Sequence, residues 1–259
     1  MTDLAGRLYI STIEGSAAEL ARTYGFGLEI AEFCTAFNMD TNFEVWDEKV
    51  KSQMSGVNRF IFHAPYNGLC PAAIDPMIAE VAEKRYTQAY NLMGAYGINT
   101  MIVHSGFMPQ LYDEGWFIEK SVPFWERFLS DKPDGFKLYM ENVFEQTPGM
   151  LCEIARDVGD KRFKLCIDTG HMTLAGKAAP AGEWLREALP FTGHVHLHNN
   201  DGKSDLHNPP GDGIADVAAY IREITKSAPS VTFTLETRDG KESVRWLTAN
   251  GFLGGGHYE

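Results

Sequence analysis

The sequence predicts a single (β/α)8 TIM barrel, and three observations support this fold class. Apolar segments with strand character alternate with helical segments along the chain, eight of each. Regular alternation of this kind is typical of a parallel sheet. The 259 residues allow about 32 for each β/α unit, which is the usual size of such a barrel. No Pro- or Ser-rich linker interrupts the series, so we expect one domain over residues 1–259.

Each predicted strand is a short apolar run that ends at polar or turn-forming residues. The strands are predicted at Leu8–Ile10, Gly27–Phe33, Arg59–His63, Ile98–Val103, Phe136–Met140, Phe163–Ile167, around His194–His198, and Val231–Leu235. The helices are predicted at Ser16–Tyr24, Phe43–Met54, Ala72–Tyr96, Tyr112–Leu129, Met150–Val158, Glu183–Leu189, Asp216–Lys226 and Lys241–Ala249. A doubly wound open sheet is the alternative, but no G-x-G-x-x-G pattern follows the first strand.

The seventh strand leads into the most histidine-rich stretch of the chain, HVHLHNNDGKSDLH. His194, His196 and His198 alternate with apolar residues, which is the period-two pattern of a strand with two different faces. Turn-forming residues follow, so we place Asp205 and His207 on a loop. A solvated polar loop is the ordinary interpretation of such a stretch. So many metal-ligating side chains in so short a stretch favour a metal site instead.

The same kind of residue recurs at the ends of six consecutive strands. The residues are His63, His104, Glu141, Asp168 with His171, His196, and Glu236. Parallel strands bring their carboxyl ends to one rim, and barrel enzymes carry their active sites there. A single histidine of this set would most simply be a buried, hydrogen-bonded side chain. Their joint placement favours a metal centre at the mouth of the barrel.

Mixed imidazole and carboxylate ligands are compatible with Zn²⁺, Mn²⁺, Co²⁺ or Fe²⁺ and do not discriminate among them. With Asp205 and His207 added, nine residues are candidate ligands. One ion takes at most four to six protein ligands. Either two or three ions bind, or several of these residues contact substrate.

Composition limits the possible partners. The formal net charge is −12, which disfavours a nucleic acid or an anionic membrane, because phosphates are bound by clustered Lys and Arg. The four cysteines show no C-x-x-C spacing, so we expect reduced thiols. We detect no signal peptide and no run of eighteen apolar residues, and we expect a cytoplasmic protein.

Several segments together resemble the signature series of the xylose-isomerase-like barrel superfamily. They are HAPYNGL, IVHSG, MENV, IDTGH, HLHNND, DLH and LETR, and the resemblance spans roughly residues 8–240. This superfamily includes sugar isomerases, epimerases of the tagatose-epimerase type, and endonuclease IV, which belongs to AP endonuclease family 2.

The two branches of the superfamily imply different ligand sets. The epimerases imply one ion held by Glu141, Asp168, His196 and Glu236, with Glu141 and Glu236 also acting as the acid/base pair. Endonuclease IV implies three zinc ions, with His63, His104 and Glu141 on the first and Glu141, Asp168, His196 and Glu236 on the second. The third would be held by His171, Asp205 and His207. The resemblance provides no ligand role for His194 or His198, so we expect them either to support the ligands or to face the substrate.

Two enzymatic functions and one non-enzymatic function follow from these residues. The first is isomerisation or epimerisation of a sugar or sugar phosphate through a metal-stabilised enediolate, with His198 and Arg238 as substrate-binding residues. The second is cleavage of a phosphodiester at a di- or trinuclear zinc site. The match of all nine candidate ligands favours the second, whereas the acidic net charge and the scarcity of basic residues in the rim loops favour the first, which we prefer. A metal-stabilised binding protein is the third, and a homo-oligomer is compatible with all of them. A hydrolase or lyase that does not act on DNA is a further alternative for the same barrel.

Overall fold

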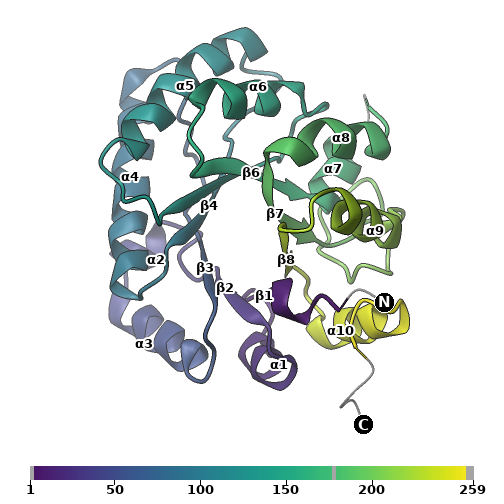
Figure 1. Ribbon diagram of the computed structural model, residues 1–259. Helices are drawn as coiled ribbons and strands as arrows, with labels where there is room; N and C mark the ends of the chain where they lie inside the picture. The colour runs from purple at the N-terminus through teal and green to yellow at the C-terminus, as the bar shows by residue number, and fades with distance from the viewer. Residues whose placement is uncertain (1–2, 177–178, 255–259) are drawn as a thin grey trace.

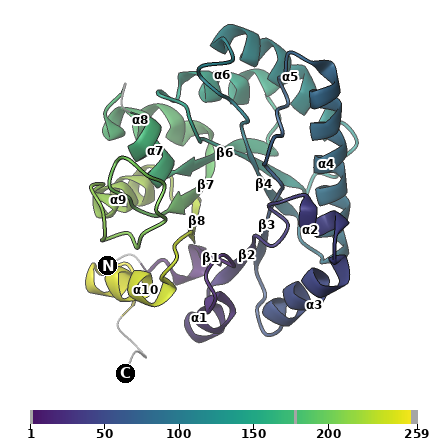
Figure 2. The ribbon, with the colours of Figure 1, turned by 180° about the vertical axis from the view of Figure 1, so that it is seen from behind.

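A computed structural model describes residues 3–176 and 179–254 and confirms the predicted fold class. Eight parallel strands pair in sequence order, and β8 pairs with β1 to close the barrel. The strands are β1 (Leu8–Ser11), β2 (Gly27–Ile30), β3 (Phe60–His63), β4 (Thr100–His104), β5 (Lys137–Glu141), β6 (Phe163–Asp168), β7 (Thr192–Leu197) and β8 (Thr232–Leu235). Figures 1 and 2 view this ring from opposite sides.

The helices form an outer ring around the strands (Figure 1). They are α1 (Ala17–Tyr24), α2 (Phe37–Asp40), α3 (Phe43–Met54), α4 (Pro76–Ala95), α5 (Glu114–Leu129), α6 (Gly149–Val158), α7 (Thr169–Ala175), α8 (Ala181–Ala188), α9 (Val217–Ser227) and α10 (Gly240–Ala249). Two 3-10 turns, Ala5–Arg7 and Leu189–Phe191, precede β1 and β7. None of the helices in residues 3–176 and 179–254 is long and apolar enough to cross a bilayer.

Several predicted boundaries were wrong by a few residues. The helix expected from Ala72 begins at Pro76, because the Asp75 side chain accepts a hydrogen bond from the Met77 amide and caps the helix there. The strand expected to reach Phe33 ends at Ile30. The short helices α2 and α7 were not predicted.

Successive side chains along each strand point alternately outward to the helices and inward to the interior of the barrel. The outward-facing residues join the helices in the main apolar core, which contains the fully buried Trp125 and Trp184. A second, smaller cluster of Ile61, Ile102, Tyr139 and Cys166 fills part of the interior. Parallel strands with both faces covered are the expected environment for such apolar runs.

The interior cluster determines which residues reach the mouth. His63, His104, Glu141 and Asp168 each follow a member of this cluster by two positions. Successive side chains alternate between the faces of a strand, so a residue two positions on points to the same interior. The register agrees, since His104 is paired with Glu141 and Asp168 with His196. These side chains therefore come together at the carboxyl ends of the strands.

Candidate metal centre

The central group of four side chains, Glu141, Asp168, His196 and Glu236, lies where the strands end. Glu141 and Asp168 are the last residues of β5 and β6, as His63 and His104 are of β3 and β4, and Glu236 directly follows β8. In β7, His196 directs Nδ1 towards three carboxylates. This nitrogen lies 3.4 Å from Glu141 Oε1, 3.6 Å from Asp168 Oδ2 and 3.0 Å from Glu236 Oε2. One ligand atom from each of Glu141, Asp168, His196 and Glu236 lies within 4.8 Å of the others, which is close enough to surround one ion.

A second group shares Glu141 with the first. His63 Nε2 and His104 Nε2 lie 3.4 and 3.5 Å from Glu141 Oε2, while the other carboxylate oxygen faces His196. Glu141 is completely buried. One carboxylate is thus placed between two sets of imidazoles and could bridge two ions.

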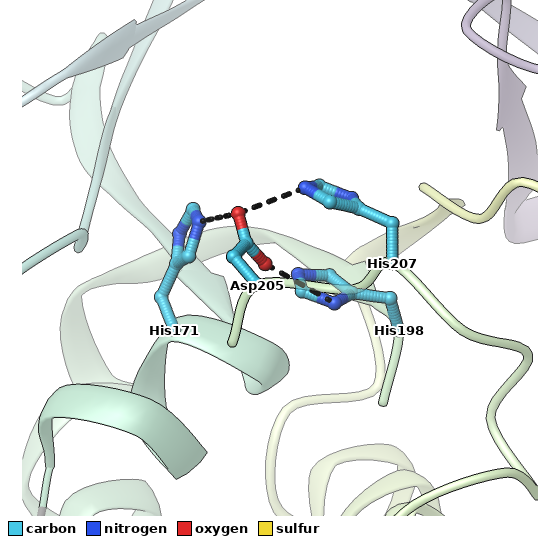
Figure 3. Close-up of side chains that lie close together, drawn as sticks. All are labelled: His171, His198, Asp205 and His207. Carbon is cyan, nitrogen blue, oxygen red and sulfur yellow. Dashed lines mark hydrogen bonds and ion pairs between the residues drawn. The ribbon is translucent and has the colours of Figure 1, made fainter. Parts of the chain in front are cut away.

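The third group combines helix α7 with the loop that follows β7 (Figure 3). His171 Nε2 and His207 Nε2 lie 3.3 and 3.0 Å from the same oxygen of Asp205. His207 has a positive φ of 50°, a conformation that non-glycine residues rarely adopt. The backbone is therefore held in an unfavourable conformation at the residue that presents this imidazole.

Backbone carbonyls orient three of these histidines. The Nδ1 atoms of His63, His171 and His207 lie 3.0, 3.0 and 2.9 Å from the carbonyl oxygens of Ala64, Asn142 and Glu236. A carbonyl oxygen can only accept, so each Nδ1 carries the hydrogen and donates it. In a neutral ring this leaves the Nε2 lone pair directed at the carboxylates. Metal-ligating histidines are commonly oriented in this way.

The electrostatics of the central group match a divalent cation. Both carboxylate oxygens of Glu141, Nδ1 of His196 and Oε2 of Glu236 are buried without a hydrogen-bond partner. Burial opposes ionisation, yet the neighbouring imidazoles hold the pKa of Glu141 and of Asp168 well below their ordinary values. Burial lowers the pKa of His104 to about 3, so this ring is neutral and free to ligate. Buried, unpaired oxygens and nitrogens at one point are what a bound metal ion would satisfy.

His198, which we predicted to bind substrate, lies below the surface of the site. It is completely buried, and its Nε2 lies 2.9 Å from Asp168 Oδ1. Its ring stacks on His207, with centroids 4.2 Å apart. Its Nδ1 lies 3.9 Å from Asp205 Oδ1, so His198 contacts Asp168, Asp205 and His207, as expected of a residue that supports the ligands.

Gly170 makes room for this ring. A Cβ atom built on Gly170 would lie 1.9 Å from His198 Cε1. We expect Gly170→Ala to lower the free energy of unfolding by about 1–3 kcal/mol, because the ring must move in a closely packed site. Urea denaturation would measure this. Gly182→Ala is the matched control, because nothing lies within 4 Å of its added Cβ. Equal stability of the two variants would contradict the expectation.

A cavity of about 1440 Å³ opens above these groups. Its polar floor is formed by seven of the nine candidate ligands, which are His63, His104, Glu141, His171, Asp205, His207 and Glu236. Asp168 and His196 lie beneath this floor. The wall includes the apolar side chains of Phe107, Met108, Leu111 and Phe144. Among the described lining residues, Lys203 and Arg238 are the only lysine or arginine side chains.

Two residues near the ligands were missed at the level of sequence. Tyr66 stacks on the His104 ring with centroids 4.1 Å apart and lines the cavity. Glu29 lies within β2, completely buried, and its carboxylate reaches His196. A glutamate in the middle of the apolar segment GLEIAEF was the only sequence signal for it.

The Asp205–His207 pair makes the stability of the metal-free protein depend on pH. Burial opposes a charge on His207, but the hydrogen bond with Asp205 and nearby carboxylates raise its pKa to about 9. Because this value exceeds the ordinary 6.5, the stabilisation is fully present below pH 6.5 and is lost as the pH rises through about 9.

Urea unfolding with a chelator present, from pH 6 to pH 9.5, would measure this dependence. We expect the wild type to be more stable than His207→Gln at pH 6 and the difference to shrink towards pH 9.5. A difference that stays constant over this range would contradict the expectation.

Comparisons with known proteins agree with the fold. A family model described as a xylose isomerase-like TIM barrel matches residues 19–250. The uncharacterized protein MJ1311 of Methanocaldococcus jannaschii is 23% identical over 230 residues, which cover 79% of this chain and 78% of that protein.

Two solved structures are similar over nearly the whole chain. One is the TTHB071 protein from Thermus thermophilus, soaked with ZnCl2, with a TM-score of 0.74, 21% identity, and coverage of 95% of this chain and 97% of that chain. The other is a D-tagatose 3-epimerase-like protein, with a TM-score of 0.74, 19% identity, and coverage of 94% and 96%. At these identities the similarity establishes a common fold.

Proposed function

Because the chain belongs to the xylose isomerase-like TIM barrel family, we propose that it is a divalent-metal-dependent isomerase or epimerase of a sugar or sugar phosphate. The supporting observation is that two buried carboxylates, Glu141 and Glu236, face one point at the floor of the cavity. Both lie within 3.4 Å of His196 Nδ1. A pair of carboxylates around one substrate carbon can exchange its proton.

Four residues would hold the central ion, namely Glu141, Asp168, His196 and Glu236. A divalent cation held there, such as Zn²⁺ or Mn²⁺, would supply Lewis-acid polarisation of a substrate carbonyl and stabilise negative charge on its oxygen. The donor set of three carboxylates and one imidazole is compatible with this role.

The proton transfers belong to side chains of this protein. One of Glu141 and Glu236 would remove a proton from the carbon next to the carbonyl, and the other would return a proton to the same or the neighbouring carbon. Return to the opposite face of the same carbon inverts it, whereas return to the neighbouring carbon moves the carbonyl. Arg238, which lines the cavity, would bind a hydroxyl or phosphate group of the substrate.

Deuterium exchange tests this proposal even while the sugar is unidentified. Protein loaded with Zn²⁺, Mn²⁺ or Co²⁺ would be incubated in D2O with a panel of ketoses, aldoses and their phosphates, and followed by proton NMR. We expect at least one substrate to lose the signal of the hydrogen next to its carbonyl and to yield an epimer or isomer. Metal binding with no exchange from any sugar would contradict the proposal and favour a binding protein.

A second candidate function is phosphodiester hydrolysis at three zinc ions. The third group favours it, because an isomerase with one ion does not need His171, Asp205 and His207 around a common point. The scarcity of lysine and arginine side chains around the cavity weighs against it, since binding a DNA duplex requires several contacts to phosphates. Cleavage of an abasic-site DNA duplex at physiological salt, together with three zinc ions per chain, would favour phosphodiester hydrolysis over isomerisation or epimerisation.

A further inference from the structure

Glu29 occupies an unusual position inside the barrel. It lies in the middle of β2, has no exposed surface, and is the register partner of Ser11 on β1 and Ile61 on β3. The mouth of the barrel, where His196 meets the carboxylates, lies one layer above it. Buried glutamates are rare unless they are paired, so its contacts indicate why it is there.

One oxygen of Glu29 makes all of its close polar contacts. Oε2 accepts a hydrogen bond of 2.6 Å from the Thr234 hydroxyl, and it lies 3.2 Å from His196 Nε2. His194 Nε2 is farther away, at 3.6 Å, and lies 2.8 Å from the Thr234 hydroxyl oxygen. The direct partner of Glu29 among the candidate metal ligands is therefore His196.

The two ring nitrogens of His196 have different surroundings. Nε2 meets Glu29, whereas Nδ1 faces Glu141, Asp168 and Glu236 and has no hydrogen-bond partner. A neutral imidazole carries one hydrogen, and an ionised carboxylate can only accept it. With the hydrogen on Nε2 and donated to Glu29, the lone pair of Nδ1 is directed at the central group.

We propose that Glu29 is a positioning residue that holds the hydrogen of His196 on Nε2 and so makes Nδ1 available as a metal ligand. In His63, His171 and His207 a backbone carbonyl holds the hydrogen on Nδ1 and leaves Nε2 free. In His196 of β7, the Glu29 side chain from β2 holds it on Nε2 and leaves Nδ1 free. Without Glu29, the hydrogen could move to Nδ1 and bond Glu236 Oε2, which lies 3.0 Å away. This inference rests on the proposed central metal ion but not on the identity of the substrate.

Three variants test the role of Glu29. Glu29→Leu removes the acceptor, and Glu29→Gln retains an oxygen that can accept from both Thr234 and His196. Glu32→Leu is the matched control. Glu32 is a buried glutamate two residues beyond β2, it accepts a hydrogen bond of 2.6 Å from the Thr12 hydroxyl, and it does not line the cavity.

Zn²⁺ affinity at the central group would be measured by competition with a chelator. We expect Glu29→Leu to bind about 10- to 100-fold more weakly, which is the usual effect of losing a partner that orients a ligand. We expect Glu29→Gln to stay within about 5-fold of wild type by the same reasoning, and Glu32→Leu to match wild type. Unchanged affinity in Glu29→Leu would overturn the inference.

Nitrogen-15 spectra of labelled histidine provide a second readout that needs no variant to fold. In the zinc-loaded wild type, we expect His196 to carry its hydrogen on Nε2 and to bind metal through Nδ1. The opposite tautomer would overturn the inference. Absence of zinc from the central group of the wild type would overturn both this inference and the metal dependence. Zinc binding with the expected tautomer but no sugar turnover would support this inference and contradict the proposed function alone.

Discussion

Glu236→Gln is expected to lower turnover by about 10²- to 10⁴-fold while leaving the fold intact, because a proton-transfer group is lost. Glu236 follows β8 at the rim, where side chains contribute more to function than to packing. Glutamine has the same shape and can still approach His196, but it cannot accept a proton. Deuterium exchange from the sugar identified above would measure the loss, and circular dichroism would report the fold.

Glu32→Gln is the control for this experiment. It also replaces a buried rim glutamate, but one that contacts Thr12 and Lys49 rather than the ligands. We expect it to retain wild-type exchange. If Glu236→Gln stays folded and exchanges as fast as Glu32→Gln, then Glu236 is not the proton-transfer group, and if it unfolds, Glu236 has a structural role.

Saturating metal is expected to raise the melting temperature by about 10 °C relative to protein kept in a chelator. An ion at about 1,000 times its dissociation constant stabilises the native state by about 4 kcal/mol, which corresponds to a shift of this order in a chain of this size. The physical reason is that Glu141, Asp168 and Glu236 are buried around one point with unpaired atoms among them. Thermal scans with Zn²⁺, Mn²⁺ or chelator would measure the shift.

Glu141→Gln should lose most of this stabilisation, because Glu141 contributes to both the central group and the group formed with His63 and His104. Gly182→Ala, at an open surface position, should retain it. Identical melting temperatures with metal and with chelator would contradict a metal centre. Counting the ions bound per chain in the same samples would distinguish one ion from three.

Much of the fold was accessible from the sequence because the strongest patterns are local. Helix α3 was predicted with both of its ends, Phe43 and Met54, as the structure has them. Helix α7 was missed, because seven residues are too few to form a helix by propensity alone. Its first turn is instead held by Asp168, whose side chain accepts a hydrogen bond of 2.6 Å from the His171 amide.

The site was less accessible than the fold, and His198 shows why. The resemblance gave His198 no ligand role and left two alternatives, a residue that supports the ligands or one that faces the substrate. The structure buries His198 against Gly170 and Asp168, on segments about thirty residues earlier in the chain. The residues next to His198 in the sequence do not predict that contact.

The sequence by itself determined the barrel and the set of side chains that surround its mouth. Two periodicities, in the helices and in the strands, specify which faces are buried, and parallel strands must end at one rim. The resemblance to endonuclease IV implied how those side chains divide into groups, and only the tertiary structure decided the distances within each group and that Glu29 lies against His196. Both depend on distances between strands that are far apart in the chain, and closure of the barrel sets those distances.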